Sequence, residues 1–462
     1  MTREPNRAFA AAVAEARVSN KGLALRVRQL AQRDGQTSST DHAAVKRYLD
    51  GMQPKLPAAR YLAAALSEKL GRRLTPADIG FTAGTDETRP ASLLLPPLTY
   101  PADVPAAAEH LGRLARFDAE VGTAPELARW DGDATPSVVT GYLFGSGAPS
   151  LDTAASSRGP LDAAAIRLTT ANLMQLDFQL GGGHTRELLL FFFRNTVLPI
   201  LSTGSRTTTA HRDLLSAAGE LTQMLGWSAY DSGRHGAAQR YFVQTLRLAR
   251  EAGDDPLGAR LLANLSHQAN FLGRFDEAVQ LARAAQARLA PGSSKTLGAM
   301  LLAMEARALA SLGDASACVA ALSRAERAFE RRDPDEDPPW IGYFDAAELA
   351  GETAHCFRDL RHATETETFA AIAIDPVLTP PRTRALIDMV RATGALHAGN
   401  LDQALATARA AVELSGGLRS SRWRSYVRDF LRAASTAHRQ DARVVDLTTF
   451  VSERFRPPAA TG

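Results

Sequence analysis

The sequence predicts an all-α protein in which a small helical domain precedes a long array of paired helices. Apolar residues recur with helical spacing over most of the 462 residues. A short motif that begins with glycine recurs about every 40 residues in the second half of the chain. Aromatic residues make up only 6% of the chain, so the core must consist mainly of Ala, Leu and Val, which suit close helix packing.

Residues 1–81 are predicted to form a compact domain of four helices. The apolar stripes of these helices begin at Phe9, Leu23, Ala44 and Tyr61. Either Ser39 or Thr40 can cap the third helix, and Gly51 can end it. We expect Ile79 and Phe81 to fold back onto the core of this domain.

Positive charge is concentrated in the same domain. Residues 1–81 contain 14 Lys and Arg against 7 Asp and Glu, a net charge of +7, whereas the remainder carries −4. A genome that favours Arg over Lys does not explain this segregation of net charge. The asymmetry predicts a polyanionic partner, such as nucleic acid, for the N-terminal domain alone.

Residues 82–160 are predicted to be a linker region with one helix. Residues 82–105 are rich in proline and lack a helical period, whereas residues 106–121 form one amphipathic stripe. The alternating stretch after the turn-forming Asp131-Gly132-Asp133 is compatible with a β-hairpin over residues 130–144. Residues 145–160 are rich in Gly, Ser and Pro and indicate a second linker.

Residues 161–456 are predicted to form a repeat domain. Its motif consists of a glycine, four further residues and a small residue, and each copy predicts a helix, a turn and a second helix. Clear copies start at Gly233, Gly273, Gly313 and Gly399, and a degenerate copy runs from Arg358 to Ala363.

The repeats resemble tetratricopeptide repeats, because Leu225-Gly226 precedes the first turn and Ala238-x-x-x-Phe242 follows it. The stretch from Ala44 to Gly51 with Pro54 resembles the Cro and phage-repressor class of helix-turn-helix domains. The resemblances imply an N-terminal helix-turn-helix domain followed by a tetratricopeptide-like helical solenoid.

The whole layout is similar to actinobacterial transcriptional regulators that join these two domains. The motif Asp177-x-x-x-Gly181-Gly-Gly-His184 and the stretch from Gly226 to Gly233 are of a kind associated with that group. More distantly, the chain is similar to the peptide-pheromone receptors of Gram-positive bacteria. The resemblance implies that the third helix lies in the major groove of DNA.

The third helix carries the candidate DNA-contacting side chains. If Val45, Tyr48 and Leu49 face the core, the basic residues between them face solvent and can reach phosphates or guanine edges. Hydroxyl groups at the start of the helix can bind a phosphate. The candidate DNA-binding residues are Ser39, Thr40, His42, Lys46, Arg47 and Lys55. The alternative is a basic helix face that is merely solvated.

The inner face of the array carries the candidate effector site. In a tetratricopeptide array the first helix of each pair lines the concave surface, and here it offers amide, aromatic and guanidinium groups. Such groups suit a peptide or a small amphiphile. The candidate effector-binding residues are Gln223, Trp227, Tyr230, Arg260, His267, Asn270, Arg307 and His355. Alternatively, they only solvate an empty groove.

The remaining chemical groups do not indicate an enzyme. Cys318 and Cys356 are too few for a disulfide framework and are interpreted as small core residues. The histidines of the array have no histidine four residues away, so neither a metal nor a cofactor is expected. Glu348 and Glu352 share one helix face, which we interpret as solvated. The glycines before His184 lack the Lys-Ser/Thr of a phosphate-binding loop and indicate an interhelical turn.

Together these patterns predict a cytoplasmic, homodimeric transcriptional regulator. Its expected partners are double-stranded DNA and a peptide or small-molecule effector, or a partner protein. No targeting signal or membrane span is recognised, so no membrane partner is expected. The alternative function is a tetratricopeptide adaptor that binds partner proteins, with an N-terminal domain of only structural importance.

Overall fold

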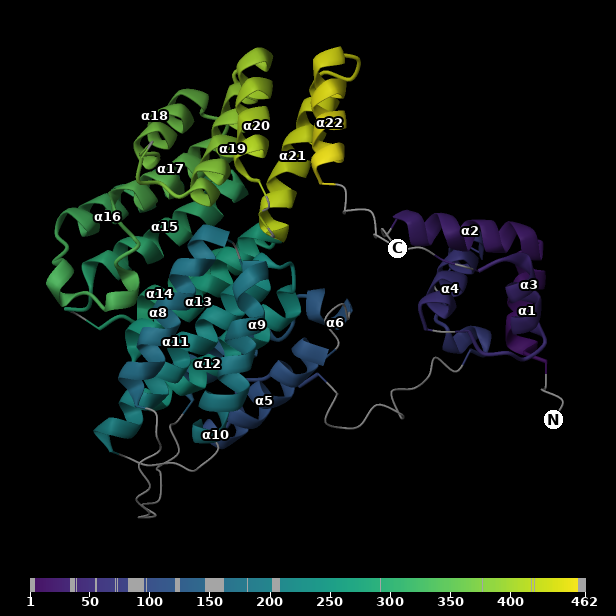
Figure 1. The fold of residues 1–462 in the computed structure, drawn as a ribbon, viewed down its shortest axis with the longest axis horizontal. Helices are drawn as coiled ribbons and strands as arrows, with labels where there is room; N and C mark the ends of the chain where they lie inside the picture. Colours follow the sequence, from purple (N-terminus) through teal and green to yellow (C-terminus); the bar gives the residue numbers. More distant parts are fainter. Residues whose placement is uncertain are drawn as a thin grey trace. The chain divides into compact units, whose positions relative to one another are not determined.

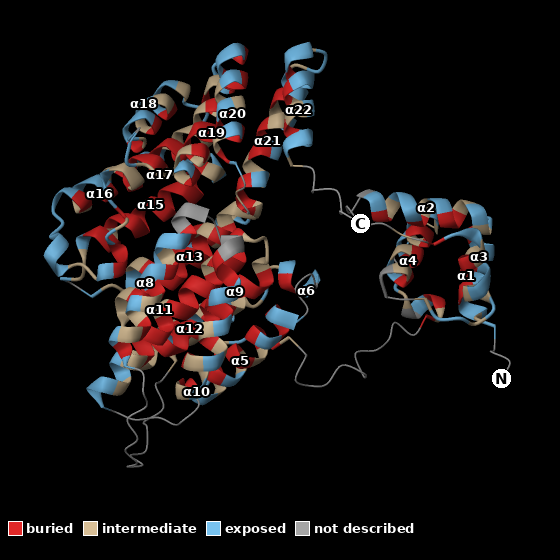
Figure 2. Ribbon diagram, in the orientation of Figure 1, coloured by how far each residue is buried: buried red, intermediate tan, exposed pale blue. Residues whose placement is uncertain are grey.

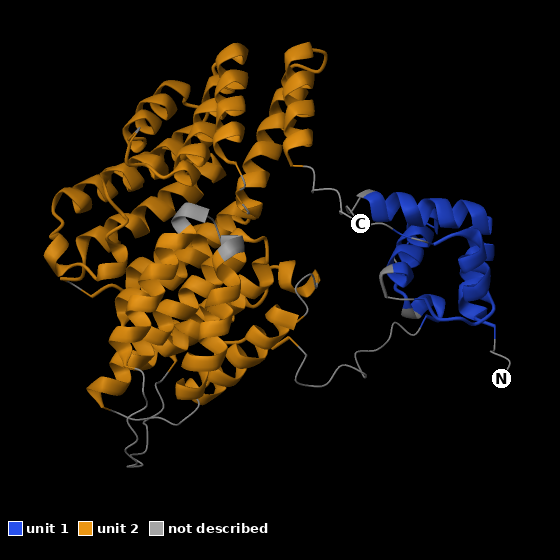
Figure 3. Cartoon of the chain, in the orientation of Figure 1, with its two compact units in different colours: residues 1–94 blue, residues 95–462 orange. Residues whose placement is uncertain are grey.

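The computed structural model confirms the all-α fold. It describes residues 5–33, 38, 40–54, 56–70, 72, 74–81, 95–96, 98–120, 125–145, 162–180, 182–201, 208–290, 292–375, 377–416, 418 and 420–455. Every regular element within these ranges is a helix. The chain divides into two compact units, residues 1–94 and residues 95–462 (Figure 3).

Unit 1 is a helical domain around a small aromatic core. Its helices are α1 (Arg7–Glu15), α2 (Asn20–Arg33), α3 (His42–Leu49), α4 (Leu56–Leu70) and the 3-10 turn η1 (Ala77–Ile79). The rings of Phe9 and Phe81 lie 4.6 Å apart, and both side chains are fully buried. Ile79 is buried beside them, so the expected return of residues 79–81 to the core is confirmed.

The start of α3 differs from the prediction. Asp41 caps the helix, because its Oδ1 accepts a hydrogen bond of 2.7 Å from the backbone N–H of Ala44. Thr40 is buried and its hydroxyl accepts a hydrogen bond from Ser38, while Ser39 lies outside the described residues. The helix ends before Gly51, whose φ of 93° suits glycine.

Unit 2 begins with three helices that pack against the array. They are α5 (Val104–Glu120), α6 (Pro125–Ala128) and α7 (Thr135–Phe144), and all three contact α12. The β-hairpin suggested for residues 130–144 is therefore wrong. Pro136 lies in the first turn, where proline favours a helix, and the buried Tyr142 anchors α7 to the array despite its β-branched residues.

A buried carboxylate fixes α5 to the array and excludes a linker role for this helix. The Asp118 side chain is fully buried and binds Arg234 Nη1 at 2.8 Å, the Tyr241 hydroxyl at 3.2 Å and the Arg186 guanidinium. Arg186 lies in α9, Tyr241 lies in α12, and Arg234 directly precedes α12. Of the predicted linker region, residues 95–145 belong to unit 2, while residues 82–94 and 146–160 lie outside the described ranges.

The rest of unit 2 is a stack of helix hairpins, which confirms the predicted helical array (Figure 1). It is preceded by α8 (Ala163–Leu180), α9 (Gly182–Phe192), a π-helical turn (Phe193–Val197) and α10 (Leu198–Leu201). The hairpins are α11 (Thr209–Asp231) with α12 (His235–Ala252), α13 (Asp255–Phe271) with α14 (Phe275–Arg288), α15 (Lys295–Leu312) with α16 (Ala315–Glu330), α17 (Ala346–Asp359) with α18 (Ala363–Ala373), α19 (Pro381–His397) with α20 (Leu401–Leu414), and α21 (Ser421–Ala437) with α22 (Ala442–Arg454).

The repeated turns have one backbone geometry, and they correct the predicted register of the degenerate copy. The four predicted glycines, Gly233, Gly273, Gly313 and Gly399, have φ between 77° and 81°. In the degenerate copy the equivalent residue is Arg361, with φ of 62°, and not Arg358. The sequence shows no glycine there, so only the backbone reveals the true register.

The corrected register exposes an insertion between α16 and α17. Arg361 follows Gly313 by 48 residues, whereas the earlier turns are 40 residues apart. The extra residues form two 3-10 turns, η5 (Pro334–Glu336) and η6 (Pro339–Ile341), and lead to Tyr343 and Phe344. This segment contributes to the cavity described below.

The first helices of the hairpins form a row that closes on itself. Neighbouring first helices contact each other along the whole row, in the order α11, α13, α15, α17, α19 and α21. The last helix, α21, also contacts the first, α11, and α8 contacts α19. Figure 2 shows buried residues concentrated in the central helices of this unit, where neighbours cover α13 and α15 on several sides. The closed row surrounds a partly open cavity.

Candidate functional site

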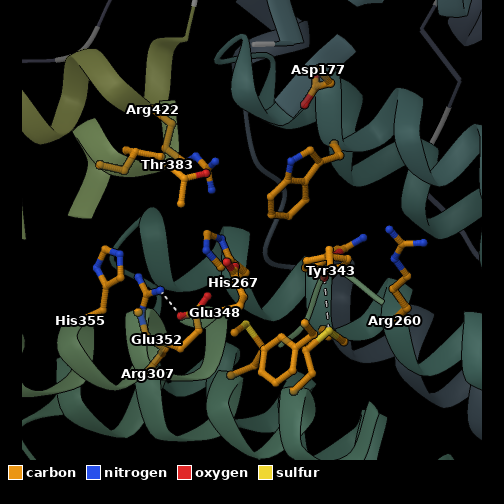
Figure 4. A pocket seen from close by; sticks show the side chains of 18 of the residues that line it. Asp177, Arg260, His267, Arg307, Tyr343, Glu348, Glu352, His355, Thr383 and Arg422 are labelled. Atoms are coloured by element: carbon orange, nitrogen blue, oxygen red, sulfur yellow. Dashed lines mark hydrogen bonds and ion pairs between the residues drawn. The ribbon is translucent and has the colours of Figure 1, made fainter. Parts of the chain in front are cut away.

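The cavity of unit 2 lies on the inner face of the closed row and has a volume of about 160 Å³. Every lining residue comes from α8, from the first helix of a hairpin, or from the segment between α16 and α17. The spacing along each helix is three or four residues, as in Arg260, Asn264 and His267 of α13. The array therefore directs one face of each first helix toward the same space (Figure 4).

The structure brings six of the eight predicted effector residues together. These six residues line the cavity: Gln223, Trp227, Arg260, His267, Arg307 and His355. Tyr230 is fully buried behind it and its hydroxyl lies 2.9 Å from His267 Nδ1, so it positions that imidazole. Asn270 does not line this cavity but an adjoining open groove of about 520 Å³, which shares Arg307 and Tyr426 with it.

The apolar part of the lining was missed in the sequence. Four of the seven methionines of the chain line the cavity: Met174, Met224, Met300 and Met304. Thioether side chains are flexible and polarisable and adapt to varied apolar ligands. The pair on α15, four residues apart on one face, is the only signal of this lining that the sequence offered. Tyr343 and Phe344 come from the insertion, which the repeat pattern could not reveal.

Two arginines of the lining are held by one buried carboxylate. Asp231 Oδ1 lies 2.8 Å from Arg382 Nη2 and 3.4 Å from Arg422 Nε, and it accepts a hydrogen bond of 2.9 Å from Ser420. Burial alone would raise the pKa of Asp231, but the two guanidinium groups hold it below its ordinary value. Both arginines are thus fixed, and Asp231 balances one of their two positive charges, while the buried carboxyl group of Asp177 also interacts with both.

The two glutamates of α17 do not form the solvated face that the sequence suggested. Glu352 forms an ion pair with Arg307, and both side chains are largely buried. Glu348 also lines the cavity. Burial, together with the negative charges of Glu352 and Asp345, raises the pKa of Glu348 to about 8, so that it is mainly protonated at neutral pH.

The two histidines of the lining are neutral at neutral pH. Burial, with the nearby Arg307 guanidinium, holds the pKa values of His267 and His355 well below the ordinary value. The Trp227 ring lies 5.5 Å from His267 and 5.2 Å from the Arg422 guanidinium. The imidazoles therefore act as polar aromatic surfaces rather than as cations.

Arg260 differs from the other three arginines of the lining. It is 7% exposed and its guanidinium stacks over the Trp340 ring at 4.5 Å, yet no carboxylate in the described part of the chain pairs with it. Glu220, whose charge acts on Arg260, is bound by Arg167 Nε at 2.8 Å. One helical turn later, the buried Asn264 Nδ2 has no acceptor.

In unit 1, α3 presents the basic face that the sequence predicted. His42, Lys46 and Arg47 are exposed, and Val45 is fully buried on the opposite side. Within the described residues neither Lys46 nor Arg47 forms an ion pair, in contrast to Arg26, which binds Glu68 at 2.6 Å. These exposed cations are therefore available to a polyanion.

Two of the other predicted DNA-contacting residues cannot be placed, and one is wrong. Ser39 and Lys55 lie outside the described residues. Thr40 is 3% exposed, so its hydroxyl is not accessible to a phosphate. The carboxylate of Asp41 occupies the N-terminus of α3 and repels an anion there, which leaves phosphate binding to the basic side chains.

A family model matches part of unit 1. Residues 9–82 match the family described as the SP15 N-terminal domain. The match begins within α1 and includes the other described helices of unit 1. No curated protein matches the chain. Among the described helices, none has the length and apolarity needed to cross a membrane.

Proposed function

We propose that the protein is a cytoplasmic DNA-binding transcriptional regulator whose array senses an effector. The observation that carries this proposal is the exposed face of α3, where Lys46 and Arg47 have no ion-pair partner within the described residues. Cations in the last turn of a short helix also stabilise it through the helix dipole, but Lys46 and Arg47 leave their charged groups exposed and thus open to a polyanion. A helix that docks against DNA requires such exposed cations.

The packing of α3 supports its role as a recognition helix. Val45 is buried in the core and Tyr48 packs against Phe81, with their ring centroids 6.1 Å apart. This anchoring fixes the rotation of α3 about its axis, so that His42, Lys46 and Arg47 project outward together. Arg47 can form two hydrogen bonds to a guanine edge, and Lys46 can bind phosphate.

The cavity supports the sensing role. A ligand regulates DNA binding only if it binds two arrangements of the chain with different affinity. Arg382 and Arg422 line the cavity and also hold α19 and α21 to α11 through Asp231. A ligand that contacts these arginines can therefore strengthen or weaken the attachment of α19 and α21 to α11. A typical coupling of about 1–3 kcal/mol would change operator affinity roughly 5–150-fold.

We further propose that the regulator acts as a homodimer. One small helical domain offers few base contacts, and two copies on half-sites about 34–36 Å apart, or a multiple of this distance, supply the missing specificity.

Selection of bound fragments from a random duplex library by the full-length chain tests the proposal. The expected result is enrichment of one inverted repeat whose half-sites are separated by a whole number of helical turns. Recovery of unenriched fragments, at a salt concentration where nonspecific binding is weak, would contradict it. The selected duplex then serves as the ligand for all measurements of DNA affinity.

The open groove favours a second candidate function, that of a peptide-binding adaptor. This groove of about 520 Å³ is lined by Phe271, Phe275 and Phe430 together with several arginines, including Arg358 and Arg428. Aromatic side chains with arginine suit an acidic, partly apolar peptide. An adaptor would bind such peptides equally well after Lys46 and Arg47 are replaced, and it would select no DNA sequence.

A further inference from the structure

We propose that the internal cavity binds a small organic monoanion, namely a carboxylate attached to an apolar body of about the size of one aromatic ring. This inference deepens the proposed function by assigning a chemical class to the effector. It rests on the cavity alone, however, and holds whether or not the ligand alters DNA binding.

The first argument is the isolated guanidinium of Arg260. The side chain is more than nine-tenths buried, it lines the cavity and it has no carboxylate partner within the described residues. A buried cation without a counter-charge is costly, so its persistence points to a partner that is supplied from outside. The unfilled donor of Asn264, one turn along the same face of α13, points to the same acceptor.

The second argument is the balance of charge. Arg307 is matched by Glu352, and Arg382 and Arg422 share Asp231, with Asp177 also acting on both. Arg260 remains, so the site requires one negative charge. A dianion such as a phosphate monoester would need a second guanidinium group without a carboxylate partner, and the other three arginines of the described lining each have one.

The third argument is the size and polarity of the space. An apolar cavity of about 150 Å³ accommodates a molecule of the size of benzene, and the volume here is about 160 Å³. Met300 and Met304 project from α15, next to the helix that carries Arg260, and Phe344 adds an aromatic surface. The carboxylate would bind Arg260 and Asn264 while the ring lies against these side chains.

The arrangement also explains the insertion between α16 and α17. Trp340 supports the Arg260 guanidinium from one side at 4.5 Å, while Tyr343 and Phe344 reach the cavity wall. Figure 4 shows Tyr343 beside Arg260, far from His355. The inserted segment therefore builds the end of the cavity where the anion binds.

Titration calorimetry of the full-length protein with benzoate tests the inference. Benzamide serves as the uncharged ligand of equal size, and inorganic phosphate as an anion without an apolar body. The expected result is that benzoate binds at least tenfold more tightly than benzamide and that phosphate binds more weakly than benzoate. Equal affinity for benzoate and benzamide, or no binding of benzoate at millimolar concentration, would overturn the inference.

Two variants locate the anion. Arg260→Met keeps the apolar stem that stacks on Trp340 and removes the charge, so benzoate should lose its tenfold advantage while benzamide affinity is retained. Asn264→Leu, which keeps Arg260, should lower the affinity for benzoate severalfold. Unchanged preference for benzoate in both variants would overturn the assignment, because the anion would then bind elsewhere.

The outcome is separable from that of the proposed function. Benzoate binding without any effect on the selected duplex would support the cavity assignment and contradict its role as the effector site. Sequence-specific DNA binding without benzoate binding would support the regulator and overturn the ligand class.

Discussion

Asp231 and Arg382 are 151 residues apart in the sequence, and their side chains form a buried ion pair with 2.8 Å between Oδ1 and Nη2. The pair joins the end of α11 to the start of α19. Together with Arg422 of α21 it turns the row of helices into a closed ring. The arginines of this closure, Arg382 and Arg422, also line the cavity.

Replacement of Asp231 by Ala should destabilise unit 2 by about 3–5 kcal/mol, because two buried guanidinium groups would lose their counter-charge. Urea unfolding of the full-length chain measures the loss. Asp402→Asn is the control, since it removes an exposed ion pair with Arg443 and a charge in the first turn of α20, which together should contribute no more than about 1 kcal/mol. A loss below about 1 kcal/mol for Asp231→Ala would show that the closure does not depend on this carboxylate.

Arg260 and Arg307 should respond in opposite directions to the same substitution. Arg260→Met removes an unpaired buried cation and should raise the thermal midpoint of the ligand-free chain. Arg307→Met leaves the largely buried Glu352 without its partner and should lower it. Differential scanning calorimetry compares the two. A lower midpoint for Arg260→Met would mean that Arg260 stabilises the fold and is not reserved for a ligand.

Glu348 should make both stability and benzoate affinity depend on pH. Its pKa is raised from 4.5 to about 8, so the folded chain holds the proton more tightly. This stabilisation is complete below pH 4.5 and is lost progressively as the pH rises to about 8. Benzoate affinity should fall as the pH rises through 8, because ionised Glu348 adds a negative charge to the cavity.

The control for this dependence is Glu348→Gln, which lacks the titrating group. The charged or titratable groups that act on Glu348 are Asp345, Glu352, Arg307, Arg422 and Tyr343. His267 and His355 destabilise the chain below their ordinary pKa of 6.5, in the opposite direction, so the difference between parent and variant isolates the glutamate. Parallel pH profiles for the two chains would refute the assignment.

The turns of the array offer a test of the corrected register. Gly313→Ala should cost about 1–2 kcal/mol, because φ is 81° and a methyl group there meets no neighbour, so the cost is purely conformational. Arg361→Gly should be neutral or slightly stabilising, since it relieves a φ of 62°. If Arg361→Gly lowered the free energy of unfolding as much as Gly313→Ala, the contacts of the Arg361 side chain would outweigh the strain of its backbone, and the prediction would be wrong.

The sequence predicted features that depend on local pattern. Helices, the glycine turns and six side chains of the cavity follow from apolar spacing and a repeated motif, because both act over a few residues. The helix α7 was missed because its β-branched residues favour a β-strand. In the folded protein the packing of the buried Tyr142 outweighs this local preference.

Features that depend on distant contacts left no such pattern. The pairing of Asp231 with Arg382 spans 151 residues, and neither residue stands out in its own helix. Glu348 resembled a solvated residue, because only the closed row shows that its face points inward. The packing of α5 through Asp118 was hidden for the same reason.

The central claim is that α3 binds DNA, and the salt dependence of duplex affinity tests it most directly. Three proteins are titrated with the selected duplex at several salt concentrations: the parent, the double variant Lys46→Ala/Arg47→Ala, and a control double variant, Lys295→Ala/Arg439→Ala. The control removes two exposed cations of unit 2. Each lost phosphate contact should reduce the slope of log K against log salt by about 0.9. We expect the first double variant to bind at least tenfold more weakly with a flatter slope, and the control to match the parent. Parent-like affinity and slope in Lys46→Ala/Arg47→Ala would contradict the claim.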